Sequence, residues 1–199
     1  MFWSKIAFVY DLFENVYNSK VYRNTGRYVA AEINADDRVL ECACGTGAIS
    51  VHIAPVCKSL TATDMADGML RQTSKKTRKF KNVKVRRADM TSLKCKDSYF
   101  DKVVAGNVIH LLDDPEAAVR ELVRVCRPGG KIIIPTYINF TRKGKTSLAV
   151  KFIHAIGADF KRQFDLDSYK KFFSDAGYVN VSFHVVEGRM PCAVAVITK

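Results

Sequence analysis

The sequence lacks several features that would place it outside the ordinary globular proteins. No apolar run approaches the 18 residues of a membrane-spanning helix. The first residues show no basic stretch followed by an apolar region, so we expect no secretory signal peptide. The six cysteines form no repeated CxxC pair and lie mostly in apolar segments. We therefore expect buried free thiols in a cytoplasmic protein, and no metal site.

Acidic residues are also scarce. Asp and Glu total 20 against 32 Lys and Arg, a formal net charge of +12. Such an excess favours an anionic partner, which could be a nucleic acid, an acidic membrane surface or an anionic substrate. Residues 71–87 carry nine basic residues and no acid. This run is either a solvated helix face with its following loop or a docking surface for an anionic lipid or polymer.

The remaining composition is typical of a globular domain. Charged residues make up 26% and hydrophobic residues 48%, values that exclude disordered and fibrous classes. A chain of 199 residues predicts one domain with a sizeable core that needs no disulfide or metal to fold. We expect residues 1–199 to form that domain.

Short apolar runs alternate with helical periodicity along most of the chain. Strands are predicted at 39–42, 59–63, 83–85, 102–105 and 131–134, and helices at 47–56, 66–79 and 115–126. This alternation predicts a doubly wound α/β sheet with mainly parallel strands. Segments 180–186 and 192–198 predict an antiparallel hairpin at the sheet edge.

Two regions fall outside the alternation. Residues 1–35 show apolar residues at spacings of three and four, which predicts an N-terminal helical cap. Residues 138–162 interrupt the pattern after the fifth strand, with a helix predicted over 147–157. Both regions mix aromatic and basic residues, and we expect them to cover a site as a cap and a lid-like insertion.

The turn after the first strand carries the strongest chemical signal. Val39 to Ile49 reads as a buried strand that ends in Glu41 and turns through Gly45 and Gly47 into a helix. The glycines permit a positive φ and let a ligand approach the backbone. Free N–H groups at the start of the next helix would suit an anionic group. The alternative is a tight strand-to-helix connection with no ligand.

Further polar residues follow the next three strands. Asp64 ends the second strand, where an acid can bind ribose hydroxyls. Asp89 and Met90 follow the third strand and suit an adenine ring, and Asn107 and His110 follow the fourth. The carboxyl ends of parallel strands are where such sheets bind ligands. Asp64 could instead cap the helix that follows it.

Together these segments resemble the class I S-adenosylmethionine-dependent methyltransferases over most of the chain. Five motifs occur in the family's order: Val39–Gly47, Thr63–Met65 with Gly68–Leu70, Ala88–Met90, Phe100–Leu112 and Glu121–Gly130. The ubiquinone/menaquinone-biosynthesis methyltransferases are the most similar subgroup, through Ala43, the Gly-Thr-Gly turn and residues 6–11. Glu41 in place of Asp is similar to the small phospholipid N-methyltransferases. Cys44 in place of Gly, and the segment after His110, depart from the quinone subgroup.

The resemblance implies a Rossmann-like seven-stranded sheet with helices on both faces. It implies S-adenosylmethionine as cofactor and S-adenosylhomocysteine as product. By resemblance, the glycine turn and Glu41 would meet the methionyl part, Asp64 the ribose, and Asp89 the adenine amino group. The implied cofactor-binding set is Glu41, Ala43, Gly45, Gly47, Asp64, Met65, Met69, Asp89, Met90 and Asn107.

The methyl acceptor is predicted to be a small molecule, hydrophobic or anionic, of quinol, lipid or thiol type. A carbon or oxygen acceptor would need a base, and His110, Tyr10 and Tyr137 are the candidates. Each could equally be a core residue.

Three function classes are alternatives to a small-molecule methyltransferase. An RNA methyltransferase would use the basic surface, but the Asn/Asp-Pro-Pro-aromatic element of base-modifying enzymes is absent after the fourth strand. A non-catalytic cofactor-binding module is a second alternative. An NAD-dependent dehydrogenase is disfavoured because the third glycine of its fingerprint would fall at Ser50.

Overall fold

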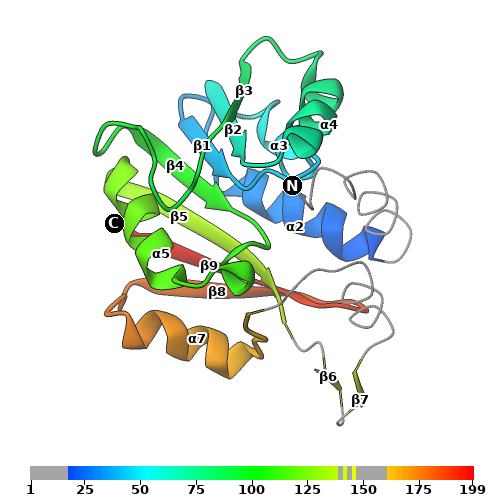
Figure 1. Cartoon of the computed structure of the whole chain (residues 1–199), viewed down its shortest axis with the longest axis vertical. Helices are drawn as coiled ribbons and strands as arrows, with labels where there is room; N and C mark the ends of the chain where they lie inside the picture. Colours follow the sequence, from blue (N-terminus) through cyan, green and yellow to red (C-terminus); the bar gives the residue numbers. More distant parts are fainter. Residues whose placement is uncertain (1–17, 139–140, 143–144, 147–160) are drawn as a thin grey trace.

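A computed structural model describes residues 18–138, 141–142, 145–146 and 161–199 (Figure 1). The predicted cap before residue 18, including Tyr10, lies outside the described residues. So does the helix predicted over 147–157. Within the described part, no helix is both long and apolar enough to cross a bilayer.

Seven strands form one mixed sheet, as predicted. Their order is β3-β2-β1-β4-β5-β9-β8. The first five are parallel, β9 is antiparallel to β5, and β8 is antiparallel to β9. Their bounds are β1 Arg38–Cys42, β2 Ser59–Asp64, β3 Val83–Arg87, β4 Phe100–Ala105, β5 Cys126–Tyr137, β8 Val181–Val186 and β9 Cys192–Thr198. A separate pair joins β6 (Thr141–Arg142) to β7 (Lys145–Thr146).

Helices cover both faces of the sheet (Figure 1). The helices α2 (Ser19–Ala31), α3 (Ser50–Ile53) and α4 (Asp67–Thr77) pack on one face, and α5 (Pro115–Val125) and α7 (Leu166–Asp175) on the other. Successive residues of the central strands therefore enter different cores. Val103 belongs to the α5 and α7 side and Val104 to the α2 and α3 side, and both are fully buried.

The helix predicted over 47–56 is much shorter in the structure. Only Ser50–Ile53 is helical, because Gly45 and Gly47 have φ values of 55° and 83°, outside the helical region. A single turn has little macrodipole. The prediction of an anion-binding helix N-terminus is therefore wrong, and the amides available to a ligand are those of the loop itself.

The sequence pattern did not identify α7. A capping box begins it: Asp165 accepts a hydrogen bond from the Ser168 amide at 2.8 Å, and the Asp165 amide donates to the Ser168 hydroxyl at 2.9 Å. Tyr169 is fully buried, and its hydroxyl donates to the carbonyl of Ile134 on β5 at 2.6 Å. This aromatic helix closes the second face of the sheet.

The start of α5 agrees with the prediction, whereas the start of the following strand does not. Asp114 caps the helix by accepting from the Ala117 amide at 2.8 Å, and Pro115 occupies the first turn. The fifth strand was predicted to begin at Lys131. It begins at Cys126 instead, with an irregular register where Phe100 pairs with Cys126.

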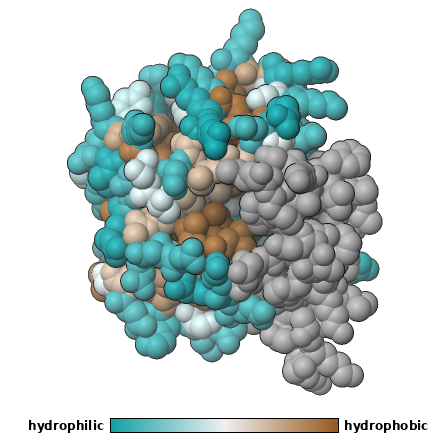
Figure 2. Space-filling model, in the orientation of Figure 1, coloured by the Kyte–Doolittle hydropathy of each residue, from teal (hydrophilic) through white to brown (hydrophobic). Residues whose placement is uncertain are grey.

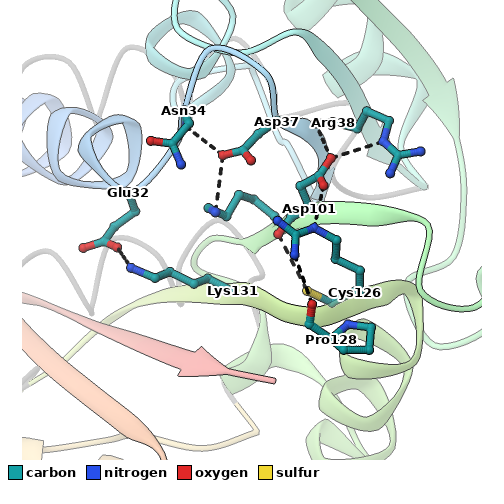
Figure 3. A network of polar contacts seen from close by, with 10 residues as sticks. Glu32, Asn34, Asp37, Arg38, Asp101, Cys126, Pro128 and Lys131 are labelled. Atoms are coloured by element: carbon teal, nitrogen blue, oxygen red, sulfur yellow. Dashed lines mark hydrogen bonds and ion pairs between the residues drawn. The ribbon is translucent and has the colours of Figure 1, made fainter.

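Charged residues join the amino ends of β1, β4 and β5 (Figure 3). The predicted site lies at the other, carboxyl, ends of the strands. Asp101 accepts from the Arg38 amide at 2.8 Å and from Arg127 Nε at 2.6 Å. Asp37 and Lys102 form a buried ion pair at 3.3 Å. These contacts fix the bases of three parallel strands and so stabilise the frame on which the site is built.

Candidate functional site

A cavity of about 290 Å³ lies at the carboxyl ends of β1, β2, β3 and β4. Its described wall consists of loop residues that follow these strands, joined by α2, the end of β5 and the β8–β9 turn. The lining residues are Tyr22, Glu41, Ala43, Cys44, Gly45, Thr46, Ala48, Ile49, Asp64, Met65, Met69, Ala88, Asp89, Met90, Gly106, Asn107, Val108, His110, Leu111, Leu112, Tyr137 and Met190.

The cavity brings together nearly all of the residues singled out from the sequence. Ten line it: Glu41, Ala43, Gly45, Asp64, Met65, Met69, Asp89, Met90, Asn107 and His110. Tyr137, a candidate base, also lines it. Tyr10 lies outside the described residues. Gly47 does not line the cavity, so its predicted contact with a ligand is not supported.

Gly47 is needed for packing rather than for ligand contact. A Cβ at this position would lie 3.0 Å from the Cα of Thr73 on α4, and φ is +83°. An L-residue would therefore be strained and crowded. Gly47 lets the loop lie directly against α4.

Gly45 is held by hydrogen bonds through both of its backbone groups. Its amide donates to Asp64 Oδ2 at 2.9 Å, and its carbonyl accepts from the Thr73 hydroxyl at 2.8 Å. No atom lies within 4 Å of the place that a Gly45 Cβ would occupy. The loop is thus fixed from behind and leaves open space at Gly45.

Asp64 is shared between the glycine loop and the start of α4. Its Oδ1 accepts from the Ala66 amide at 2.9 Å, while Oδ2 accepts from Gly45. The N-cap of α4 is Ala66, so the alternative in which Asp64 itself caps the helix is wrong. Burial raises the pKa of Asp64, and the amide bonds from Ala66 and Gly45 counteract that rise.

Glu41 is the most deeply buried acid of the cavity wall. The residue is only 2% exposed, and its Oε2 accepts from the Ser50 hydroxyl at 2.5 Å. Burial raises the pKa of Glu41 to about 8, with a further rise from the nearby charge of Asp64, against the lowering effect of the Ser50 hydrogen bond. Glu41 is therefore largely protonated at neutral pH.

Asp89, Met90 and Met65 form the outer end of the cavity. Asp89 is exposed, and its Oδ1 accepts from the amide and the hydroxyl of Thr91 at 2.9 and 2.7 Å. Met90 is buried, whereas Met65 is 44% exposed. Asp89 and Met65 are thus exposed to solvent at this end of the cavity, whereas Met90 is not.

Asn107 and His110 occupy the opposite end, after β4. Asn107 has a φ of 53°, and its Oδ1 accepts from the Tyr137 amide at 3.1 Å, which joins the ends of β4 and β5. His110 is 3% exposed, and burial lowers the pKa of its imidazole to about 4. His110 is therefore neutral at physiological pH, and its burial disfavours the protonated form.

The helical cap predicted for residues 1–35 includes α2, which contributes to the cavity wall, whereas the contribution of the β8–β9 turn was not predicted. Tyr22 and Met190 both line the cavity. Asn18 joins these segments: its Nδ2 donates to the Met190 carbonyl at 3.0 Å, and its Oδ1 accepts from the Met190 amide at 3.4 Å. The contact spans 172 residues of sequence, so no local pattern could have indicated it.

Comparisons with known proteins agree with this geometry. Residues 40–134 match a family model described as a methyltransferase domain. The chain is 30% identical over 139 residues to the ubiquinone/menaquinone biosynthesis C-methyltransferase of Bdellovibrio bacteriovorus, covering 66% of this chain and 58% of that protein. It is 34% identical over 134 residues to the phosphatidylethanolamine N-methyltransferase of Cereibacter sphaeroides, covering 65% and 64%.

The same fold occurs in a solved structure from Thermotoga maritima, an S-adenosylmethionine-dependent methyltransferase described as a possible histamine N-methyltransferase. The superposition has a TM-score of 0.78 at 18% identity and covers 100% of this chain and 98% of that one. These findings support a class I S-adenosylmethionine-dependent methyltransferase, a family whose cofactor is S-adenosylmethionine. The matched region spans less than two thirds of the two curated relatives.

The chemistry of the lining is compatible with this cofactor. Open space at Gly45 leaves room for a ligand against the backbone, and Asp64 keeps a carboxylate beside it. Asp89 and Met90 line the same cavity. Among the described residues, no cluster of His, Cys, Asp and Glu is arranged to hold a metal ion. All six cysteines are free, and five are buried while Cys95 is half-buried.

Glu41→Gln should remove one pH dependence of stability. In the wild type, the folded state keeps the Glu41 proton up to about pH 8, whereas the unfolded state loses it near pH 4.5. The resulting stabilisation is full below pH 4.5 and is lost progressively as the pH rises to about 8, at about 1.4 kcal/mol per pH unit. The amide side chain of the variant does not titrate. Urea unfolding at several pH values should give a flatter profile for the variant, and parallel profiles would contradict the assignment.

Thr73→Val should weaken cofactor binding by freeing the carbonyl of Gly45. Thr77→Val is the matched control, because the Thr77 hydroxyl also makes one buried hydrogen bond, 2.8 Å to the Thr73 carbonyl, away from the loop. Each variant should lose about 1 kcal/mol of unfolding free energy. Only Thr73→Val should raise the Kd for S-adenosylmethionine, by about threefold or more, in calorimetric titration. Equal Kd values for the two variants would show that the loop does not depend on Thr73.

Proposed function

We propose that this protein transfers a methyl group from S-adenosylmethionine to a small apolar acceptor of quinol or lipid type. The observation that carries the proposal is the meeting of Glu41, Gly45, Asp64 and Asp89 around one cavity, although they follow three different strands. This is the place where open α/β sheets bind nucleotide-like ligands. Methyl transfer needs a cavity that orients two molecules and excludes water.

Each part of the cofactor can be assigned to residues that line the cavity. Asp64 would accept from the ribose hydroxyls, and Asp89 from the adenine amino group, with Met65 and Met90 beside the ring. The Gly45 loop and the carbonyl of Asn107 would hold the methionyl part, whose ammonium group would lie near the buried Glu41. The bound cofactor supplies a methyl group activated by its sulfonium sulfur.

The side of the cavity after β4 supports an apolar acceptor. The lining residues after β4 include Val108, His110, Leu111 and Leu112, and the cavity is also lined by Tyr137, Met190 and Tyr22 from β5, the β8–β9 turn and α2. None of these is an Asp, Glu, Lys or Arg, and burial keeps His110 neutral. A charged acceptor would find no counterion in that wall, and burying an unpaired charge is costly. The name of one curated relative specifies ubiquinone/menaquinone biosynthesis, which supports a quinol acceptor. The other names phosphatidylethanolamine, whose acyl chains are apolar but whose headgroup is charged, so it supports the lipid type only through the apolar part.

His110 is the residue we propose as general base. It lines the cavity, and burial keeps its imidazole neutral at physiological pH, so one ring nitrogen carries no proton. Efficient proton transfer would require its pKa to rise when the acceptor binds. A hydroxyl or activated carbon acceptor loses a proton as it is methylated, and His110 can take that proton. Tyr137 lies in the same wall, with its amide held by Asn107, and would shape the acceptor site.

Asp64→Asn tests the cofactor site. Removing the charge should raise the Kd for S-adenosylmethionine by about tenfold or more, because charge-assisted hydrogen bonds to the ribose are lost. Asp67→Asn is the control, since Asp67 is exposed in the first turn of α4 and does not line the cavity. Calorimetric titration measures the Kd for S-adenosylmethionine of both variants. The assignment fails if both variants bind as tightly as the wild type.

His110→Asn tests the proposed base. With a naphthohydroquinone acceptor, kcat measured as S-adenosylhomocysteine release should fall by about 10² to 10⁴, while the Kd for S-adenosylmethionine stays within about twofold. His184→Asn is the control, because His184 is exposed on β8 and stacks on Tyr28 outside the cavity. A His110 variant with unchanged kcat would exclude His110 as the general base. Release of S-adenosylhomocysteine with amine acceptors only would exclude the quinol class.

A further inference from the structure

One charged region has no role in the proposed methyl transfer. This is the cationic edge of the sheet, formed by α4, the α4–β3 turn and β3 (Figure 1). Eight exposed side chains define this cationic edge: Arg71, Lys75, Arg78, Lys79, Lys81, Lys84, Arg86 and Arg87. None of them lines the cavity. The proposed methyl transfer therefore gives them no role.

The cationic edge concentrates unpaired cations in one short stretch of sequence that contains no acid. On other parts of the described surface several cations are paired, as in Arg127 with Asp101, Lys131 with Glu32 and Arg124 with Glu121. No ion pair among the described residues involves any of the eight. Their mutual repulsion costs stability unless an anionic partner is present.

These residues surround the edge of the sheet. Arg71 and Lys75 are four residues apart and so share one side of α4, and Lys79 follows in the α4–β3 turn. Lys84 and Arg86 alternate along the edge strand β3 with Val83 and Val85, which pack on the α4 side, so the two cations lie on the other face. Charges on an edge strand also prevent pairing with other chains, but that role does not explain the cations on α4.

The shape favours a membrane over a nucleic acid. Proteins that bind single-stranded nucleic acid combine a basic groove with exposed aromatic side chains on which bases stack. Here the cations follow a helix and a projecting sheet edge, and Phe80, the only aromatic residue between Asp67 and Arg87, is half-buried beneath Lys79. Figure 2 shows hydrophilic side chains projecting from this end of the molecule. A projecting cationic surface matches a planar layer of anionic headgroups.

The cationic edge also lies next to the mouth of the cavity. Arg87 ends β3 and is followed by Ala88 and Asp89, which line the cavity. Met65, 44% exposed at the rim, precedes α4 by two residues. A surface held against the cationic edge would therefore stand beside the entrance through which an acceptor must pass.

We infer that the cationic edge docks this protein on an anionic lipid bilayer, with the cavity mouth beside the headgroups. Docking rests on charge alone and does not require the proposed methyl transfer. Each Lys or Arg near an anionic membrane strengthens binding by about fivefold, and salt screens the attraction.

Flotation of the full chain with vesicles tests this inference. The test variant carries Lys75→Gln, Lys79→Gln, Lys81→Gln and Lys84→Gln. The control variant carries Lys20→Gln, Lys58→Gln, Lys96→Gln and Lys170→Gln, four exposed lysines on other parts of the surface. Both variants lose the same charge. Vesicles of phosphatidylcholine alone are compared with equal mixtures of phosphatidylcholine and phosphatidylglycerol, without S-adenosylmethionine.

The wild type and the control should float with the anionic vesicles only, and about 0.5 M salt should release them. The test variant should bind at least about a hundredfold more weakly while its Kd for S-adenosylmethionine is unchanged. Equal loss in both variants would mean that net charge alone matters and would overturn the inference. A wild type that ignores the vesicles, or that binds RNA in preference to them, would overturn it as well.

Discussion

The hydrogen bonds that fix Gly45 determine the shape of the site. The loop after β1 contains residues with positive φ and would otherwise have many conformations. Asp64 holds its amide from the end of β2, and Thr73 holds its carbonyl from α4. Gly47 makes this arrangement possible, because only a residue without a side chain can approach Thr73 so closely. The backbone face toward the cavity is thereby prepared before any ligand binds.

The amino and carboxyl ends of the parallel strands have different roles. At the starts of the strands, Asp101 and the buried Asp37–Lys102 pair join β1, β4 and β5. At the opposite ends, acids such as Glu41 and Asp64 carry raised pKa values because burial disfavours their charged forms. The first set pairs charges and stabilises the fold. The second set keeps polar groups buried beside a cavity, a cost that is offset when a ligand binds.

Much of the fold followed from the sequence, because strand and helix signals there are local. Asp114 with Pro115 predicted the start of α5, and the apolar runs predicted the strands of the sheet. The cavity could be foreseen because residues that end parallel strands must meet at one edge. Its far wall could not, since the contact between Asn18 and Met190 joins distant segments. The role of Gly47 was also hidden, because nothing local indicates that Thr73 packs against it.

The cavity at the carboxyl ends of β1 and β2 is the proposed binding site of S-adenosylmethionine. A crystal structure of the protein grown with S-adenosylhomocysteine would locate the ligand. We expect the ribose within hydrogen-bond distance of Asp64, the adenine beside Met90, and the homocysteine part against the Gly45 loop. A ligand bound elsewhere, or an empty cavity at saturating ligand, would show that the cavity is not the cofactor site.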